Sequence, residues 1–369
     1  MKFVDLEAQY RTVRKAVDKA ALRTMESGRF ILGKNGVKLE SSVAALCEVS
    51  HAVGVNSCTD ALFLSLKALG IGKGDEVITT PFSFIATAEV VAHAGAKPVF
   101  ADIDPLTFNI DPYKIEKRIT KRTRAIMPVH LYGQMADMRA INRIAHKHKL
   151  FVVEDAAQAL GAFQFHGKRF VMAGAAGGIA CFSFFPTKNL GAAGDAGMVT
   201  TDHKALAERV RLLRNHGSAQ KYHHVMLGYS SRLDELQAAI LLAKLPYLAR
   251  WNRARQKIAA RYTAAFKGFS GIATPLVVPG NTHIFHQYTI RTSRRDELRA
   301  FLEKRRIPTT VHYPLPLHLQ PALKSLGYKK GDYPEAERAA KEVLSLPMYP
   351  ELSLAAQKRI ADAIRTFFK

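Results

Sequence analysis

Lys188 lies in a segment whose residue types suit a nucleophilic amine beside a bound ligand. It follows the apolar run Ile179–Phe184, and the loop after it carries Gly191, Gly194 and Gly197. Glycines have no Cβ, so they let the backbone pass close to a ligand. A single lysine is usually a solvated surface group, so Lys188 indicates a site only in combination with other residues.

A pair of carboxylates ends a second apolar run. The sequence LFVV is followed directly by Glu154 and Asp155, and Gln158 comes three residues later. In open α/β sheets, ligands bind beyond the carboxyl ends of the strands, so these side chains are candidate ligand contacts. A helix cap is the alternative explanation for the two acidic residues.

The segment GVNSCTDAL is a third candidate point. It joins the apolar run His51–Val55 to a helical pattern that begins near Thr59. The free N–H groups and the dipole at the start of a helix suit a phosphate group. An N-capping serine or threonine explains the same residues equally well.

Together the three points meet the requirements of pyridoxal 5'-phosphate (PLP). That cofactor needs a lysine that binds it covalently, an acid that keeps its ring nitrogen protonated, and an anion site for its phosphate. Each point alone has an ordinary structural explanation, whereas all three in one predicted sheet form a much rarer combination. The combination therefore favours PLP chemistry.

Five segments resemble, in the right order, the motifs of the DegT/DnrJ-type sugar aminotransferases among the fold type I PLP enzymes. The segments are GVNSCTDAL, VITTPFSFIATAE, VVEDAAQALGA, SFFPTKNLGAAGDAG and GYSSRLDELQAAIL. They extend over almost the whole chain. The resemblance implies a transaminase that transfers the amino group of glutamate to a nucleotide-linked keto-sugar, releases 2-oxoglutarate, and passes through pyridoxamine phosphate.

The resemblance also assigns roles to residues of the cofactor site. It implies that Lys188 forms the internal aldimine, Asp155 pairs with the pyridinium nitrogen, and Gln158 hydrogen-bonds the ring hydroxyl. Phe84 is expected to stack on the ring. In some relatives that dehydrate sugars a histidine replaces the lysine, so the lysine favours transamination. Three residues are expected to hold the phosphate: Cys58, Thr59 and Ser183.

Ser230 departs from the family pattern. Relatives commonly carry asparagine at this position in the segment GYSSRLDELQAA, and that asparagine reaches the phosphate in the neighbouring subunit. The resemblance therefore implies a homodimer with shared active sites. Serine is shorter, so it leaves the contact to the partner subunit's phosphate in doubt.

Two further segments resemble the branch that acts on UDP-2-acetamido-2-deoxy-3-oxo-glucuronate. They are RNHGSAQKYHH and PTTVHYPLPLHLQPAL. In that branch, residues matching Arg232, His312 and Tyr313 surround the sugar and its carboxylate, and His216 lies near the active site. Arginine pairs well with carboxylates, and histidine and tyrosine add hydrogen bonds. Such an enzyme would supply amino sugars for surface polysaccharide or lipopolysaccharide.

Other substrates and one other function class stay open. A 3-keto-6-deoxyhexose or a 4-keto-hexose linked to dTDP, UDP or GDP is the alternative substrate. A PLP-binding regulatory protein without catalysis would share the cofactor site but lack substrate contacts, and Arg232, His312 and Tyr313 count against it. A dinucleotide oxidoreductase is disfavoured because no G-x-G-x-x-G segment follows a predicted strand.

The elements that position these residues alternate between short apolar runs and helical patterns. This alternation predicts an α/β fold with a mostly parallel sheet of seven strands, as in fold type I enzymes. We expect a large PLP-binding domain at 1–248 and a smaller C-terminal α/β domain at 249–369. The predicted strands are His51–Val55, Glu76–Thr80, Pro98–Ala101, Ala125–Val129, Leu150–Val153, Ile179–Phe184 and Met198–Thr201.

Composition limits the compartment and the partners. The net charge of +23 is spread over segments of different periodicity, so we interpret it as solvated faces and not as a nucleic-acid site. No apolar run approaches the length of about 20 residues that a membrane helix needs. The three cysteines lack metal-ligand spacing, so neither a metal site nor a disulfide framework is expected. A cytoplasmic protein fits best.

Overall fold

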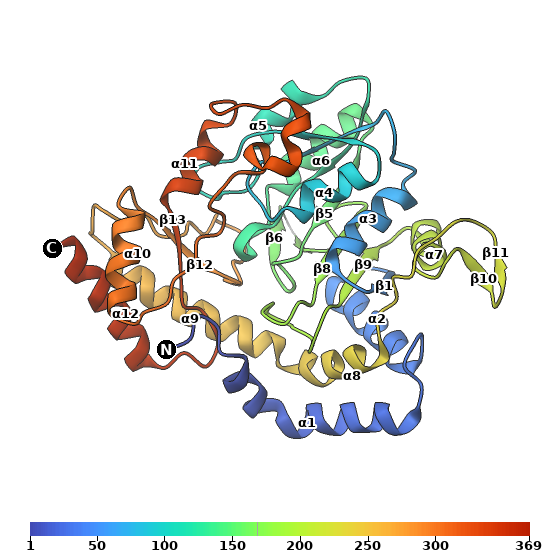
Figure 1. Cartoon of the computed structure of the whole chain (residues 1–369), viewed down its shortest axis with the longest axis horizontal. Helices are drawn as coiled ribbons and strands as arrows, with labels where there is room; N and C mark the ends of the chain where they lie inside the picture. Colours follow the sequence, from blue (N-terminus) through green and yellow to red (C-terminus); the bar gives the residue numbers. More distant parts are fainter. Residues whose placement is uncertain (168) are drawn as a thin grey trace.

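A seven-stranded sheet forms the centre of the computed structural model, which describes residues 1–167 and 169–369 (Figure 1). Its order is β1-β9-β8-β5-β4-β2-β3. Strand β9 is antiparallel to both neighbours and the other pairs are parallel, so the predicted fold class is confirmed. The strands are β1 His51–Val55, β2 Glu76–Thr79, β3 Lys97–Phe100, β4 Thr123–Met127, β5 Phe151–Asp155, β8 Ile179–Ser183 and β9 Gly197–Thr201.

The observed strand ends differ from the predicted ones most at β4, which ends at Met127 and was expected to continue to Val129. Pro128 has no N–H to donate to the neighbouring strand, so the regular ladder ends before it. Val129 rejoins the sheet only through an isolated bridge to Asp155. The carboxyl end of β5 is held there, because the Asp155 N–H donates to the Pro128 carbonyl at 2.9 Å.

Helices cover both faces of this sheet. Successive strand residues point to opposite faces, as Cys181 and Phe182 of β8 do. Cys181 packs with α3, α4 and α7, whereas Phe182 packs with α2 and α8. The large-domain helices are α1 Leu6–Ser27, α2 Lys34–Cys47, α3 Cys58–Ala68, α4 Ala86–His93, α5 Pro112–Ile115, α6 Met138–His148, α7 Lys204–Leu213 and α8 Glu235–Lys244, with the 3-10 turns η1 Glu116–Arg118, η2 Leu131–Gly133 and η3 Leu245–Tyr247.

The C-terminal part builds a second core around a two-stranded sheet. Ile258 and Tyr262 of α9 pack there, whereas Trp251 near the start of α9 packs with the large-domain helices. The helix thus links the two cores, and the predicted domain boundary near residue 248 stays a prediction. The elements are α9 Leu248–Phe266, β12 Tyr288–Arg291, α10 Arg295–Lys304, η4 Leu317–Leu319, η5 Pro321–Leu326, α11 Pro334–Glu342, β13 Val343–Leu346 and α12 Leu354–Phe368.

Two short hairpins were not anticipated from the sequence. One pairs β6 Phe163–His166 with β7 Arg169–Met172. The other pairs β10 Ser218–Gln220 with β11 His223–His224, and it projects from the body of the molecule at the right of Figure 1. Within the described ranges, every helix is too short or too polar to span a membrane.

Candidate active site

A cavity of about 500 Å³ lies at the carboxyl ends of β5 and β8, beside the start of α3. This is the edge at which ligands bind in open α/β sheets. Its lining combines residues from both parts of the chain, from Ser57 to Tyr313. The structure brings together nine of the predicted site residues there: Cys58, Thr59, Phe84, Asp155, Gln158, Ser183, Lys188, His312 and Tyr313.

Lys188 follows β8 in a tight turn at the cavity wall. Its backbone N–H donates to the Phe185 carbonyl at 2.8 Å. The turn needs glycine at position 191, since a Cβ there would lie 2.2 Å from the Pro186 carbonyl oxygen. The buried Lys244 ammonium donates to the Gly191 carbonyl and fixes the loop. Burial lowers the pKa of Lys188, which favours the neutral, nucleophilic amine.

Asp155 presents a buried carboxylate to the same cavity. It is 5% exposed, and its Oδ2 accepts a hydrogen bond from the Thr87 hydroxyl at 2.8 Å. Its Oδ1 accepts a longer bond from the Ala157 N–H at 3.3 Å. Burial raises the pKa of Asp155, while Thr87, Ala157, Lys188 and His130 lower it. A cationic ring nitrogen placed beside this carboxylate would complete its hydrogen bonding.

Glu154, the neighbour of Asp155, has a structural role in this arrangement. The His130 ring donates from Nε2 to Glu154 Oε2 at 2.8 Å, since its Nδ1 accepts from the Ala136 N–H. The N–H groups of Gly174 and Gly177 donate to the two carboxylate oxygens at 3.1 and 2.6 Å. The two adjacent acids therefore separate: Asp155 lines the cavity, and Glu154 ties loops together behind it.

Gln158 and Tyr313 meet across the cavity. The Gln158 amide oxygen accepts from the Tyr132 N–H at 2.6 Å, and its amide nitrogen donates to the Tyr313 hydroxyl at 3.2 Å. The ring of Phe84 is 56% exposed, and its centroid lies 6.4 Å from that of Tyr313. An exposed aromatic face beside a cavity is available to stack on a planar ring.

His312 stands next to Tyr313 as a neutral hydrogen-bonding group. Its Nδ1 lies 2.9 Å from the Ser345 hydroxyl, and its backbone carbonyl accepts from the Tyr132 hydroxyl. Burial, together with the charge of Lys188, lowers the pKa of His312 to about 4. The imidazole is therefore neutral at pH 7, so it contributes hydrogen bonding and no charge.

The start of α3 directs backbone N–H groups toward the end of the cavity, an arrangement that suits an anion. Ser57 caps the helix, its hydroxyl accepting from the Asp60 N–H at 3.0 Å. The first N–H groups of a helix have no intrahelical partner, and Cys58 and Thr59 supply them here. Strand β9 passes so close that a Cβ on Gly197 would lie 2.3 Å from the Ser57 carbonyl, which only glycine allows.

Three predicted residues lie outside this cavity in the single chain: His216, Ser230 and Arg232. His216 and Ser230 are exposed. The Arg232 guanidinium donates to the Ser230 hydroxyl at 2.9 Å and to the Asn215 side-chain oxygen at 3.2 Å. These residues flank the β10–β11 hairpin, which lies on the projecting edge of the molecule (Figure 1).

Several cavity residues were missed from the sequence. Ser83, Thr187 and Asp195 lie within or beside the quoted motifs but were given no role. His286 and Gln287 come just before β12, whereas residues that follow strands were the ones considered from the sequence. The buried Gln287 Oε1 has no hydrogen-bond partner within the described chain, so it is available to a ligand donor.

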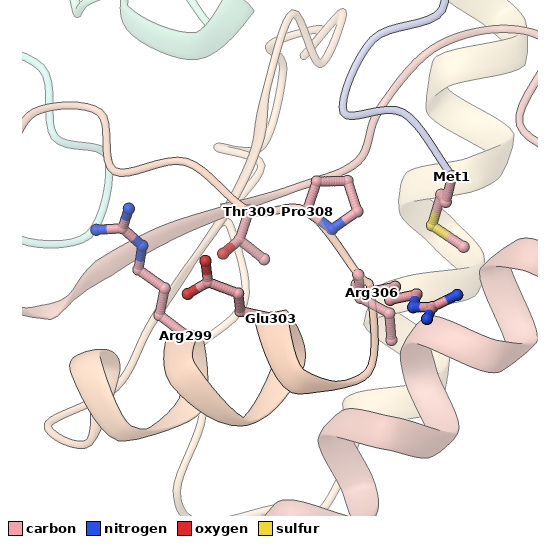
Figure 2. Close-up of a pocket in the computed structure, with 7 residues that line it drawn as sticks. Met1, Arg299, Glu303, Arg306, Pro308 and Thr309 are labelled. Atoms are coloured by element: carbon pink, nitrogen blue, oxygen red, sulfur yellow. The ribbon is translucent and has the colours of Figure 1, made fainter.

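A second cavity, of about 390 Å³, lies in the C-terminal part beside α10 (Figure 2). Arg299 and Glu303 extend from α10 there, and Arg306 follows its end. This cavity contains none of the predicted site residues. The chemistry is therefore assigned to the cavity around Lys188.

The side chains present fit PLP. A buried lysine amine with a lowered pKa, a buried carboxylate, an exposed aromatic side chain and a capped helix start surround one cavity. These groups match the aldehyde, ring nitrogen, ring face and phosphate of the cofactor. PLP is also the cofactor that aminotransferases of the family identified below use.

Comparisons with known proteins identify the family. A relative from Geobacillus stearothermophilus named "Pleiotropic regulatory protein" is 54% identical, with 99% of this chain and 98% of that protein covered. The Pseudomonas aeruginosa "UDP-2-acetamido-2-deoxy-3-oxo-D-glucuronate aminotransferase" is 44% identical, covering 99% of both. The crystal structure of S. venezuelae DesV with a ketimine intermediate is 47% identical with a TM-score of 0.97, covering 100% of this chain and 98% of that one. Residues 12–365 match the DegT/DnrJ/EryC1/StrS aminotransferase family, and the chain therefore belongs to this family of PLP-dependent nucleotide-sugar aminotransferases.

Proposed function

We propose that this aminotransferase transfers the amino group of glutamate to carbon 3 of a UDP-linked 3-keto uronate. The observation that carries the proposal is the cavity in which Lys188 and Asp155 face His312 and Tyr313. The last two match residues that surround the sugar in the uronate branch of the family. The Pseudomonas aeruginosa relative, named for such a substrate, supports the same choice.

The residues of the cavity would divide the work as follows. When bound, PLP supplies the aldehyde that takes up the amino group and the ring that withdraws electrons. Lys188 Nζ, whose pKa is lowered by burial, would move a proton between the substrate carbon and the cofactor within each half-reaction. Asp155 would hold a proton on the ring nitrogen, Phe84 would cover the ring, and Gln158 would hydrogen-bond the ring hydroxyl.

We propose further that two copies of the chain share their active sites. Arg232 has no carboxylate partner in the described part of the chain, although its guanidinium is partly buried. The hairpin beside it exposes large apolar side chains, with Leu227 95% and Tyr222 86% exposed. Exposed apolar groups of this kind mark interaction surfaces. In a dimer, the partner copy would bring Arg232 and Ser230 to the cavity.

Arg232 would then select the substrate by its charge. A guanidinium grips a carboxylate through paired hydrogen bonds, whereas a methyl group in the same place leaves the guanidinium unpaired. His312 is neutral, so Arg232 is the proposed source of positive charge for the sugar carboxylate. A uronate fits this arrangement better than a 6-deoxy sugar.

A regulatory role without catalysis is the competing proposal, favoured by the name of the Geobacillus stearothermophilus relative. Both proposals share the cofactor site, so cofactor binding does not separate them. Turnover of a keto-sugar does separate them.

The three cysteines are all free thiols, which supports the further proposal of a reducing compartment such as the cytoplasm.

The experiment is the half-reaction of the pyridoxamine form with a panel of nucleotide-linked keto-sugars. The panel contains 3-keto and 4-keto sugars, each as the uronate and as the 6-deoxy form, and the cofactor spectrum reports each reaction. We expect the 3-keto uronate to react fastest. Faster reaction of a 6-deoxy or 4-keto sugar would overturn the substrate assignment, and no reaction with any sugar would favour the regulatory role.

A further inference from the structure

A chain of buried hydroxyl groups leads from the cavity to the Asp155 carboxylate. The Thr87 hydroxyl lies 2.8 Å from Asp155 Oδ2, and the Ser83 hydroxyl lies 2.9 Å from that of Thr87. Thr87 is 0% exposed and Ser83 is 4% exposed, so bulk water does not compete for these bonds. Ser83 also lines the cavity. None of the motif assignments gives either residue a role.

The direction of this chain depends on the charge of Asp155. An ionised carboxylate only accepts hydrogen bonds, so Thr87 must donate to it, and Ser83 then donates to Thr87. A protonated carboxyl would instead donate to Thr87 and reverse the chain. Hydrogen bonds to a charged acceptor are stronger than those to a neutral one, so the arrangement favours the ionised form.

Asp155 needs such support because its surroundings oppose ionisation. Burial raises its pKa, and the bond from Thr87 is the largest of the effects that lower it. The other titratable groups that interact with Asp155 are Lys188, His130, Cys58, Cys181 and Tyr313. The thiols and the phenol carry no positive charge, and burial disfavours the charged form of Lys188, so the hydrogen bond from Thr87 lowers the pKa of Asp155 more than the charge of Lys188 does.

We propose that Thr87, oriented by Ser83, is a positioning residue that keeps Asp155 ionised for its pairing with the ring nitrogen of PLP. The threonine touches neither the cofactor nor the substrate in this proposal and acts through Asp155. The inference rests on the proposed role of Asp155 beside that nitrogen. It predicts that the hydroxyl of Thr87 matters only when the bound ring carries a nitrogen that can be protonated.

The test compares the binding of two cofactors to the apoprotein. One is PLP, and the other is its 1-deaza analogue, in which carbon replaces the ring nitrogen. Thr87→Val keeps the shape of the side chain and removes the hydroxyl, and we expect it to weaken PLP binding about tenfold while leaving deaza-PLP binding unchanged. Thr87→Ser should restore PLP binding to within about twofold of the wild type.

Two controls separate this role from a structural one. Thr200→Val removes a hydroxyl of equal burial that donates to a neutral carbonyl, that of Gly174, and it should affect both cofactors alike. Asp155→Asn should weaken PLP binding selectively. If Asp155→Asn weakens the binding of PLP and of deaza-PLP equally, the proposed role of Asp155 fails. If Asp155→Asn weakens PLP binding selectively but Thr87→Val weakens both cofactors equally, only the role of Thr87 is overturned.

A pH profile provides a second readout. Removal of a hydrogen bond to the carboxylate raises the pKa of Asp155, so PLP binding should weaken on the acid side at a higher pH than in the wild type. We expect the acid limb of the affinity profile to move up in pH in Thr87→Val and to return in Thr87→Ser. An unmoved limb with uniformly weaker binding would overturn the proposal.

Discussion

The cavity around Lys188 and the segment 216–232 contain two parts of one predicted site. They differ in whether their side chains find partners within the same chain. In the cavity, Asp155, Gln158 and His312 all have defined hydrogen-bond partners within the same chain. In the segment, Arg232 contacts only neutral oxygens of nearby residues, and Leu227 is almost fully exposed. The cavity is therefore preorganised by contacts within the chain, whereas the segment 216–232 leaves polar and apolar side chains exposed at the surface.

This difference follows from where each part lies in the fold. Asp155 and Ser183 of the cavity lie at the ends of central strands, and most buried polar groups in such places have partners within the chain. The segment 216–232 lies around a short hairpin at the edge, where water satisfies its polar groups. If two copies share sites, changes in the cavity should abolish chemistry, and changes in the segment should act on the partner's site.

Loss of Lys188 is expected to have the largest effect. Lys188→Ala removes both the covalent anchor and the proposed proton carrier, so turnover should fall about 10³-fold or more. Lys204→Ala, which removes an exposed lysine on α7, is the control and should keep full turnover. Borohydride reduction and peptide mapping of the wild type should find the cofactor on Lys188, and a label on another lysine would contradict the assignment.

Mixing two variants that each turn over the 3-keto uronate slowly tests whether sites are shared. Lys188→Ala and Arg232→Ala chains, unfolded and refolded together, should form mixed dimers with one intact site each. Random pairing makes about half of the dimers mixed, so about a quarter of wild-type activity should return. Activity that stays at the level of the separate variants would place both residues in one chain's site and break the comparison.

Replacement of Arg232 should reduce the preference for the uronate by a smaller factor than the loss of turnover expected for Lys188→Ala. Loss of a charge-assisted bond to the sugar carboxylate costs about 1.5 to 3 kcal/mol, which corresponds to about ten- to a hundred-fold in catalytic efficiency. We expect Arg232→Ala to lose this preference for the uronate over the 6-deoxy sugar. The glutamate half-reaction serves as the reference for general damage to the site. An equal loss of efficiency with both sugars would mean that Arg232 does not distinguish them.

The smallest expected effect is a gain. Ser230→Asn introduces the residue that is common in relatives, and its longer side chain would reach the phosphate in the partner's site. PLP should therefore dissociate a few-fold more slowly. Dialysis followed by absorbance measures the retained cofactor. Ser230→Ala is the matched control and should not slow dissociation. Faster loss of PLP from Ser230→Asn would contradict the proposed contact.

Local sequence patterns determined the sheet and its main site residues. The seven strands were predicted within about two residues, since buried parallel strands are short apolar runs that need no knowledge of their neighbours. Lys188 and Asp155 were found because each follows such a run, and the order of strands then brings their ends to one edge. The same patterns were silent on the hairpins β6–β7 and β10–β11, which are short and largely exposed.

Contacts between distant segments were decided only by the tertiary structure. Residue types alone do not separate Glu154 from Asp155, the family resemblance selects Asp155, and the pleat of β5 then places Asp155 at the cavity and Glu154 behind it. Thr87 donates to Asp155 across 68 residues of sequence, and His286 and Gln287 reach the cavity from the C-terminal part. Hydrogen bonds depend on positions to within a few tenths of an ångström, which are set by the packing of whole layers and not by the local order of residue types.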